Sequence, residues 1–257
     1  MLFPISDDDN ALSSRGRAYV TLALVVLNVL VYFVLQQSDA FTYGYSVVPY
    51  ELTTGQDLVG MESVTVTDNI TGEVQQVEIP QAPGPFPIWL TVLTAMFMHG
   101  GIGHLLGNML YLWIFGDNVE HRFGHLPFLG LYLACGFVAT WAQVLADPSS
   151  IIPNLGASGA ISGILGAYLV LFPRNRVRVV LLVFVIQVPA LVVLGLWIVT
   201  QLLNGWGATM ASEETVGGVA YLAHIGGFFT GVILALLLRR RIPNRLAVPP
   251  PLGVYER

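Results

Sequence analysis

The sequence predicts an all-α, polytopic membrane protein in which six transmembrane helices form a bundle. Of its 257 residues, 54% are hydrophobic and only 11% are charged, whereas about a quarter of the residues in an ordinary soluble domain are charged. The mean hydropathy is +0.69, and several apolar stretches reach or approach the ~20 residues that span a hydrocarbon core. The predicted spans are residues 18–36, 92–115, 126–146, 157–172, 177–203 and 219–238.

The basic residues orient these spans. The chain contains no lysine, so all 11 of its basic residues are arginines. With the N-terminus in the cytoplasm, every arginine falls on the cytoplasmic side, as the positive-inside rule requires, and the opposite side carries only acidic charges. We therefore expect a cytoplasmic tail at 1–17, a six-helix membrane domain at 18–240 and a cytoplasmic tail at 241–257. The first span is uncharged and no cleavage site follows it, which argues against a signal peptide.

The longest connection between predicted spans is the outer loop at residues 37–87. Within it, residues 62–79 alternate branched and polar side chains around Asn69 and Gly72, a pattern typical of a β-hairpin. A loop of this length could bind or gate a ligand, or it could be an inert cover. No nucleic-acid motif is present. The lone Cys135 cannot form an intrachain disulfide, so we interpret it as a small apolar packing residue.

A layer of polar residues crosses the predicted spans. His104, Asn108, Ser158 and His224 lie 14 to 18 residues before the nearest cytoplasmic arginine, on three spans that all run from outside to inside. At ~1.5 Å per helical residue, they lie roughly 21–27 Å above those arginines, just below the outer surface. Ionisable residues inside a span are costly and usually functional. The shared depth therefore predicts an active site within the membrane.

Helical spacing supports this layer. His104 and Asn108 are four residues apart and share a helix face. Gly227 and Gly231 lie on the face of His224 and form a small-xxx-small pair, which lets two membrane helices approach closely. Each polar residue alone has a structural explanation, because a membrane serine usually bonds a backbone carbonyl one turn back and a histidine often only packs. The set predicts function better than any member.

Three motifs in this layer resemble those of the rhomboid family of intramembrane serine proteases. Residues 156–159 read Gly-Ala-Ser-Gly, which is similar to the family's GxSG signature. Residues 223–231 read AHIGGFFTG, similar to its AHxxGxxxG pattern. His99, His104 and Asn108 match the two histidines and the asparagine of its second span. The motifs occur in family order, and the resemblance covers the six-span core as far as Leu238.

The resemblance implies a rhomboid-like six-helix bundle and a set of residue roles. Ser158 is implied as the nucleophile, His224 as the general base, and His104 and Asn108, with the Ser158 backbone N–H, as oxyanion donors. We assign Gly156 and Ser162 to substrate binding.

Two further positions, His99 and Glu120, fit structural positions of the family. Many rhomboids carry a tyrosine four residues after the nucleophile, where this chain has Ser162, and the family's Trp-Arg pair is absent because Leu90 follows Trp89. We therefore expect His224 to be oriented by other packing or by a Ser162 hydrogen bond.

The predicted chemistry is peptide hydrolysis by a Ser158–His224 dyad. A serine hydroxyl needs a base within hydrogen-bond reach, and the spans offer no acid near the layer to complete a triad. We expect Ser158 to open its helix after the turn at residues 153–156, so that free N–H groups lie beside it. No cofactor or metal is expected. The substrate would be a membrane-spanning segment of another protein, cleaved near its outer end.

The expected surroundings are a lipid bilayer, most simply a prokaryotic plasma membrane, with no nucleic acid and an open oligomeric state. Three alternatives remain. The first is a catalytically silent rhomboid-like protein that binds membrane clients. The second is a metal-dependent hydrolase using His99, His104 and His224, although His99 and His104 are spaced poorly and no acidic ligand accompanies them. The third is a transporter whose substrate site is the polar layer.

Overall fold

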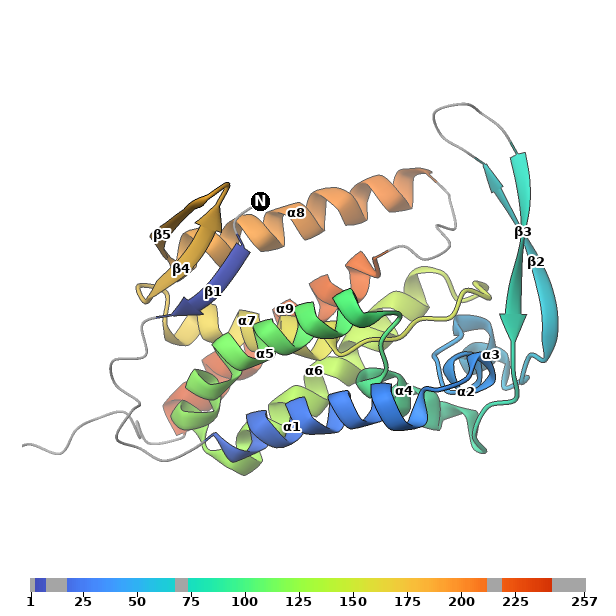
Figure 1. Ribbon diagram of the computed structural model, residues 1–257, viewed down its shortest axis with the longest axis horizontal. Helices are drawn as coiled ribbons and strands as arrows, with labels where there is room; N and C mark the ends of the chain where they lie inside the picture. Colours follow the sequence, from blue (N-terminus) through green and yellow to red (C-terminus); the bar gives the residue numbers. More distant parts are fainter. Residues whose placement is uncertain (1–2, 8–17, 68–73, 212–218, 242–257) are drawn as a thin grey trace, which may run out of the picture.

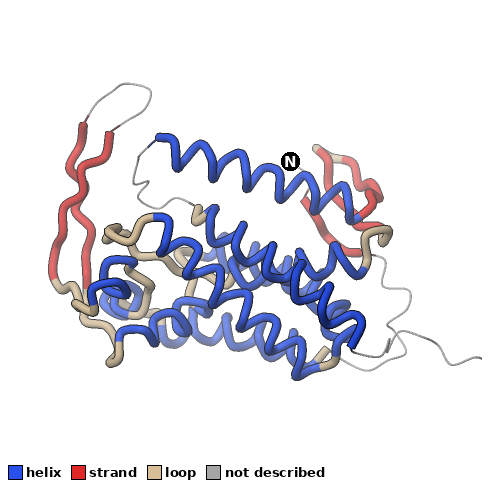
Figure 2. The backbone as a smooth tube through the Cα atoms, turned by 180° about the vertical axis from the view of Figure 1, so that it is seen from behind, coloured by secondary structure: helices blue, strands red, loops and turns tan. Residues whose placement is uncertain are grey.

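Helices dominate the structure, a computed structural model that describes residues 3–7, 18–67, 74–211 and 219–241. The long helices run roughly along a common axis, with a small β-sheet at each end (Figures 1 and 2). The helices are α1 (Tyr19–Leu30), η1 (Val31–Leu35), α2 (Asp39–Gly44), α3 (Pro49–Thr54), η2 (Ile88–Leu90), α4 (Thr91–Thr94), η3 (Ala95–Phe97), α5 (Ile102–Phe123), α6 (His125–Ala146), α7 (Ser158–Leu171), α8 (Ala190–Ala211) and α9 (Tyr221–Arg241). The strands are β1 (Phe3–Asp7), β2 (Gly60–Thr67), β3 (Val74–Gln81), β4 (Arg176–Leu181) and β5 (Phe184–Pro189).

The prediction of an all-α chain is therefore correct only in its main feature, that the fold is mostly helical. Strands β2 and β3 pair antiparallel from Gly60↔Gln81 to Thr67↔Val74, which confirms the hairpin expected at 62–79. Its turn, around Asn69 and Gly72, lies outside the described residues. At the opposite end, β1, β4 and β5 form a second antiparallel sheet in the order β1-β4-β5. Strand β1 belongs to the segment predicted as a polar tail, residues 1–17.

Two of the described helices, α6 and α9, are long and apolar enough to cross a membrane. A third candidate is the pair of segments Ile88–Phe97 and Ile102–Phe123, which meet at an angle of 76°. Three shorter apolar helices cover Tyr19–Leu35, Ser158–Leu171 and Ala190–Trp206. These apolar helices follow the order of the predicted spans and overlap them, and their bounds differ most from the prediction in two places.

The first difference lies in the span predicted at 92–115, which is broken at residues 98–101. The long helix α5 begins only at Ile102 and runs to Phe123. Gly100 and Gly101 stand at the break, where residues without a Cβ leave the backbone free to turn sharply. His99 consequently lies in the break and not on a helix.

The second difference is larger, because the span predicted at 177–203 begins as a β-hairpin. Strands β4 and β5 occupy residues 176–189, and α8 starts at Ala190 and extends to Ala211. A short apolar run does not by its periodicity distinguish a strand from a buried helix. The run is rich in valine, whose branched side chain suits a strand, and Arg176 and Arg178 alternate with buried Val177 and Val179.

Helix α7 is the centre of the bundle and packs against α5, α6 and, most extensively, α9. A Cβ added at Gly227 would overlap the Gly159 carbonyl, and one added at Gly231 would overlap the Gly163 carbonyl. The two helices therefore meet backbone to backbone, as predicted from the small-xxx-small pattern. We call this contact the glycine seam.

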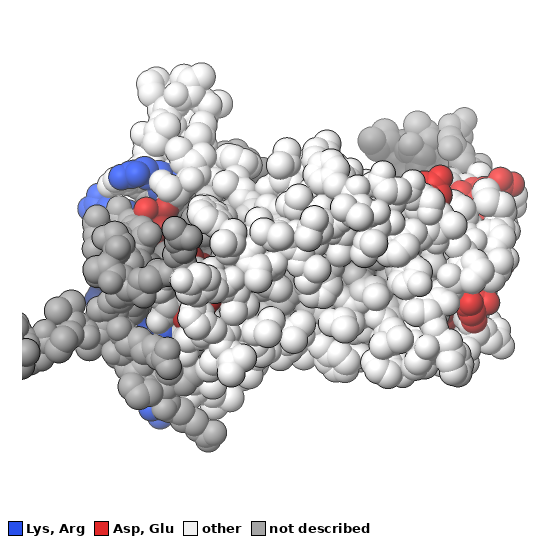
Figure 3. All heavy atoms as spheres, turned by 60° about the horizontal axis from the view of Figure 1, so that its bottom comes forward, with Lys and Arg blue, Asp and Glu red and all other residues white. Residues whose placement is uncertain are grey.

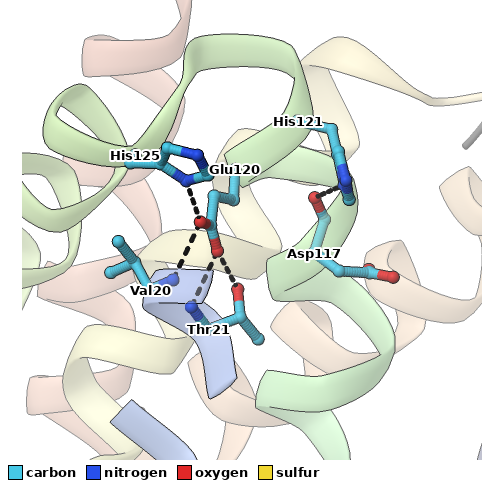
Figure 4. Close-up of polar contacts among 6 residues, drawn as sticks. All are labelled: Val20, Thr21, Asp117, Glu120, His121 and His125. Atoms are coloured by element: carbon cyan, nitrogen blue, oxygen red, sulfur yellow. Dashed lines mark hydrogen bonds and ion pairs between the residues drawn. The ribbon is translucent and has the colours of Figure 1, made fainter. Parts of the chain in front are cut away.

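Glu120 joins three helices at the end of the bundle where α5 ends (Figure 4). Its carboxylate accepts hydrogen bonds from the Val20 N–H at 2.9 Å and from the Thr21 N–H and hydroxyl, both at 2.7 Å. It also pairs with the His125 Nδ1 at the start of α6. The acid thus satisfies free N–H groups in the first turn of α1, which agrees with the structural position expected for it.

The outer segment between η1 and η2 ties down the stretch that leads to α7. Val47 and Asn154 exchange two backbone hydrogen bonds of 2.9 and 2.7 Å, and the Tyr50 N–H donates to the Ser150 carbonyl at 3.0 Å. Non-helical backbone near a membrane needs such protein partners for its polar groups. The outer segment therefore supports residues 150–156 directly.

The glycine seam leads to a first prediction, on stability. Gly231→Ala should lower the thermal midpoint in detergent, because the new methyl group forces α9 away from the Gly163 carbonyl, at a cost of about 1–3 kcal/mol or more. Gly195→Ala in α8 is the matched control, since no atom lies within 4 Å of its added Cβ. It should leave the midpoint unchanged or slightly raised. Equal midpoints for the two variants would contradict the seam.

Candidate active site

Ser158 stands at the first position of α7, directly after an extended connection. The first intrahelical hydrogen bond in α7 runs from the Ile161 N–H to the Ala157 carbonyl, so the N–H groups of residues 158–160 have no partner within the helix. This confirms that Ser158 opens its helix. The positive end of the helix dipole and free donors thus lie beside the hydroxyl.

Gly156 shapes the turn that presents Ser158. Its φ of 138° lies in a region that L-residues rarely adopt, and its N–H donates to the Ala95 carbonyl at 2.9 Å. A Cβ at this position would come 2.8 Å from the His104 Cε1 atom and 3.6 Å from the Ser158 Oγ atom. Glycine is therefore required twice here, once for backbone conformation and once for space. The same geometry places the His104 ring and the Ser158 hydroxyl together, because both lie beside the one Cβ position at Gly156.

The protonation pattern of His104 follows from its contact with the helix break. The Gly100 N–H donates to the His104 Nδ1 at 3.3 Å, so the neutral ring carries its proton on Nε2. That Nε2 is the atom 3.0 Å from the Cβ position at Gly156. His104 therefore offers a hydrogen-bond donor on the side of Ser158.

Asn108 lies one turn further along α5 and is 8% exposed. Its side-chain Nδ2 atom is buried and has no hydrogen-bond partner among the described residues. Burying an amide donor unpaired costs about 1–3 kcal/mol, so such groups are rare unless a ligand or water satisfies them. An unpaired donor on the face of His104 is what an oxyanion site requires.

His224 comes to Ser158 through the glycine seam. Its neighbour Ala223 places a carbonyl oxygen 3.8 Å from the Cβ position at Gly159, which follows Ser158 in the chain. The two residues therefore flank one contact between α7 and α9. Within the described part of the chain no hydrogen bond joins the Ser158 hydroxyl to His224, and catalytic hydrogen bonds are often long in unliganded enzymes.

His224 is oriented by α8, an element in which the sequence prediction found no site residue. The Gln201 Oε1 atom lies 2.8 Å from the His224 Nδ1 atom, and the Trp197 ring centroid is 5.9 Å from that of His224. A carbonyl oxygen can only accept, so this contact fixes the tautomer with the proton on Nδ1 and leaves Nε2 as the acceptor. Gln201 is 7% exposed; a buried glutamine in an apolar span was the signal that could have revealed it.

The Ser162 hydroxyl bonds the backbone, and no hydrogen bond among the described residues joins it to the His224 imidazole. The hydroxyl donates to the Ser158 carbonyl at 2.6 Å, and the side chain is 1% exposed. Of the two expected orienting mechanisms for His224, the contact from other packing is therefore the one observed. The substrate contact predicted for Ser162 stays a prediction. In this structure the Ser162 hydroxyl already donates a hydrogen bond to the Ser158 carbonyl.

His99 is buried beside the site rather than in it. The Gln36 side chain clamps the His99 backbone, donating to its carbonyl at 2.7 Å and accepting from its N–H at 3.0 Å. The His99 ring lies edge-on to His104 with centroids 5.2 Å apart. Gln36 thus holds the helix break from which His104 follows, and it was also absent from the predicted site.

A small cavity of about 50 Å³ opens next to Ser158. It lies between η3, α6 and the first turn of α7, and Ala223 of α9 lines it as well. Gln143 on α6 contributes a polar wall, and its Oε1 atom accepts from the Ala223 N–H at 3.3 Å. Gly156, predicted to bind substrate, also lines the cavity. A space of this size holds a water molecule or a small side chain.

Comparisons with known proteins agree on one family. A model described as the rhomboid domain matches residues 87–241. The chain is 31% identical over 160 residues to "Rhomboid protein 1, mitochondrial" of Saccharomyces cerevisiae, covering 61% of this chain and 44% of that protein. It is 34% identical over 148 residues to "Rhomboid protease GluP" of Bacillus subtilis, covering 58% of this chain and 26% of that protein. The match therefore spans less than half the length of these relatives.

The contact between α8 and His224 leads to a second prediction. In the wild-type protein, ¹⁵N NMR of labelled histidine should show His224 in the Nδ1–H tautomer, and Gln201→Leu should give a mixture of tautomers. Gln143→Leu is the matched control, because that glutamine bonds the Ala223 backbone and not the ring. An unchanged tautomer in Gln201→Leu would show that other contacts orient His224.

Proposed function

Because the chain belongs to the rhomboid family, we propose that it is an intramembrane serine endopeptidase. Its substrates would be transmembrane segments of other membrane proteins, cleaved near the outer face of the bilayer. The observation that carries the proposal is the meeting of three helices around one serine. The His104 ring of α5 and the Ser158 hydroxyl of α7 both lie beside Gly156, and the residue before His224 of α9 lies against Gly159 in the glycine seam. We propose that Asn108, one turn after His104 and with an unpaired buried amide, faces the same serine.

Rhomboid proteins are integral to membranes, and the surface of this chain fits that setting. On the face drawn in Figure 3, the visible arginines gather at one end of the bundle, acidic residues are visible at both ends, and the belt between the ends is free of charge. We propose that all six apolar helices span the bilayer as one membrane domain, residues 18–240, with both termini and the arginine end in the cytoplasm. The prokaryotic plasma membrane belongs to the same proposal and rests on the arginine pattern alone, because the relatives include both mitochondrial and bacterial proteins.

The proposed reaction begins with attack of the Ser158 Oγ on the carbonyl carbon of the scissile peptide bond. The His224 Nε2 accepts the hydroxyl proton, because Gln201 leaves that nitrogen as the acceptor. The developing oxyanion accepts hydrogen bonds from the His104 Nε2–H, the Asn108 Nδ2 and the Ser158 N–H. No carboxylate takes part, so the pair acts as a dyad whose base is oriented by a neutral amide.

The second half of the reaction uses the same groups in reverse. As the C–N bond breaks, His224 gives its proton to the leaving nitrogen, and the acyl group remains as an ester on the Ser158 Oγ. A water molecule then attacks the ester while His224 takes its proton, and collapse returns that proton to Ser158. The cavity beside Ser158 suits a small substrate side chain next to the scissile bond, with Gly156 as the contacting backbone.

A reporter with a cleavable transmembrane segment, reconstituted with the protein in vesicles, tests the proposal. Wild type should cleave it, Ser158→Ala and His224→Ala should reduce cleavage at least 10³-fold, and a chelator should have no effect. Cleavage that survives Ser158→Ala would overturn the serine mechanism, and loss with chelator alone would favour a metal-dependent hydrolase. A wild-type protein that binds the reporter without cutting it would be the catalytically silent alternative.

The unpaired amide of Asn108 gives a separate prediction for the oxyanion site. Asn108→Ala should lower kcat by about 10²–10³-fold with little change in KM, because the lost donor acts mainly in the transition state. Asn118→Ala is the control, since this asparagine of the same helix bonds Asp7 at the opposite end of the bundle. A kcat within threefold of wild type for Asn108→Ala would remove Asn108 from the oxyanion site.

A further inference from the structure

The hairpin of β4 and β5 ends in a turn made of large apolar side chains. Leu182 and Val183 are 87% and 83% exposed, and Phe184 and Val185, which follow on β5, are 68% and 59% exposed. A hairpin turn in water usually carries asparagine, aspartate or glycine. Contiguous exposed apolar residues on a protein normally mark a surface that another apolar phase covers.

The backbone conformation of the turn gives a second reason to expect a small or polar residue, and not leucine, at position 182. Leu182 adopts a φ of 57°, in the left-handed region that costs a non-glycine residue roughly 1–2 kcal/mol. Asparagine or glycine would relieve that cost and would also be better solvated. Leucine at this position is therefore suited to a low-polarity environment rather than to the turn itself.

Arginines occupy the other end of the same hairpin. Arg174, Arg176 and Arg178 are all exposed, and no described carboxylate forms an ion pair with any of them. On β4 the two arginines alternate with Val177 and Val179, which are fully buried in the bundle. The hairpin thus has a basic base and an apolar tip.

The hairpin also stands where a membrane surface would meet it. It projects sideways from the bundle at the arginine end, with a charge-free tip and basic side chains near its base (Figure 3). Strand β1 holds it on one side, where the Asp7 carboxylate accepts hydrogen bonds from Asn118 at 2.6 Å and from the Tyr168 hydroxyl at 2.5 Å. On the other side β5 continues into α8 without a linker.

We propose that the β4–β5 hairpin is an interfacial anchor that binds anionic phospholipids. Its tip, residues 181–185, enters the acyl-chain boundary of the leaflet at the arginine end, and Arg174, Arg176 and Arg178 bind the phosphate groups of anionic lipid heads. An apolar tip supplies the hydrophobic part of such binding, and arginines near an anionic surface contribute the electrostatic part. The inference rests on the membrane setting of the chain and not on proteolysis.

A fluorescent label at Val183→Cys, in vesicles that contain phosphatidylglycerol and phosphatidylcholine, tests insertion of the tip. The native Cys135 is fully buried and should stay unlabelled in the folded protein. The Val183 label should be quenched by nitroxide groups on lipid acyl chains and shielded from aqueous iodide. A label at the exposed Gln56→Cys, in the outer segment, is the control and should show the reverse pattern. Iodide quenching at Val183 equal to that at Gln56 would overturn the proposed insertion.

The same label tests the headgroup site. Nitroxide-labelled phosphatidylglycerol should quench the Val183 label more strongly than nitroxide-labelled phosphatidylcholine at equal mole fraction. Arg176→Gln and Arg178→Gln should each lower that preference about fivefold, while Arg240→Gln, at the C-terminal end of α9 and outside the hairpin, should leave it unchanged. Equal quenching by the two lipids in wild type would overturn the anionic-lipid site. Neither result depends on whether the protein cleaves a reporter, so the two proposals fail separately.

Discussion

The site depends on how closely α7 and α9 approach each other. Gly227 meets the carbonyl of Gly159, and one turn later Gly231 meets that of Gly163. Both contacts move four residues along each helix in the same chain direction, so the two helices are parallel and the contacts fix their register. A one-turn slip would carry Ser158 about 5.4 Å past His224. The close backbone contact between the two helices thus fixes the positions of Ser158 and His224 at the end of the seam.

The non-helical stretches around Ser158 follow a second constraint. Residues 98–101 and 150–156 expose backbone N–H and C=O groups that an apolar phase would not satisfy. Gln36 pairs with both backbone groups of His99, and Val47 pairs with both of Asn154. Segments far apart in the sequence therefore supply the hydrogen bonds that let the chain bend beside Ser158. The outer segment is part of the scaffold of the site.

The candidate site could be predicted from the sequence because helical rise is constant, so counting from the arginines assigns His104, Asn108, Ser158 and His224 to one depth. The prediction failed for the apolar run after Arg176, which forms the β4–β5 hairpin. A continuous apolar run has no hydrophobic periodicity, so the sequence pattern does not distinguish a strand from a helix there. The prediction also missed Gln201: a glutamine in an apolar span signals a functional position, but the sequence does not say that its partner is His224. That contact depends on where α8 begins, which the hairpin sets.

The hydrogen bond from Gln201 of α8 makes the orientation of His224 depend on how α8 packs. Helix α8 lies along one side of the bundle (Figures 1 and 2) and reaches the site mainly through Gln201 and Trp197. Any displacement of α8 would remove the only acceptor that the described residues give the His224 Nδ1, so the orientation of this imidazole depends on how tightly a neighbouring helix stays packed.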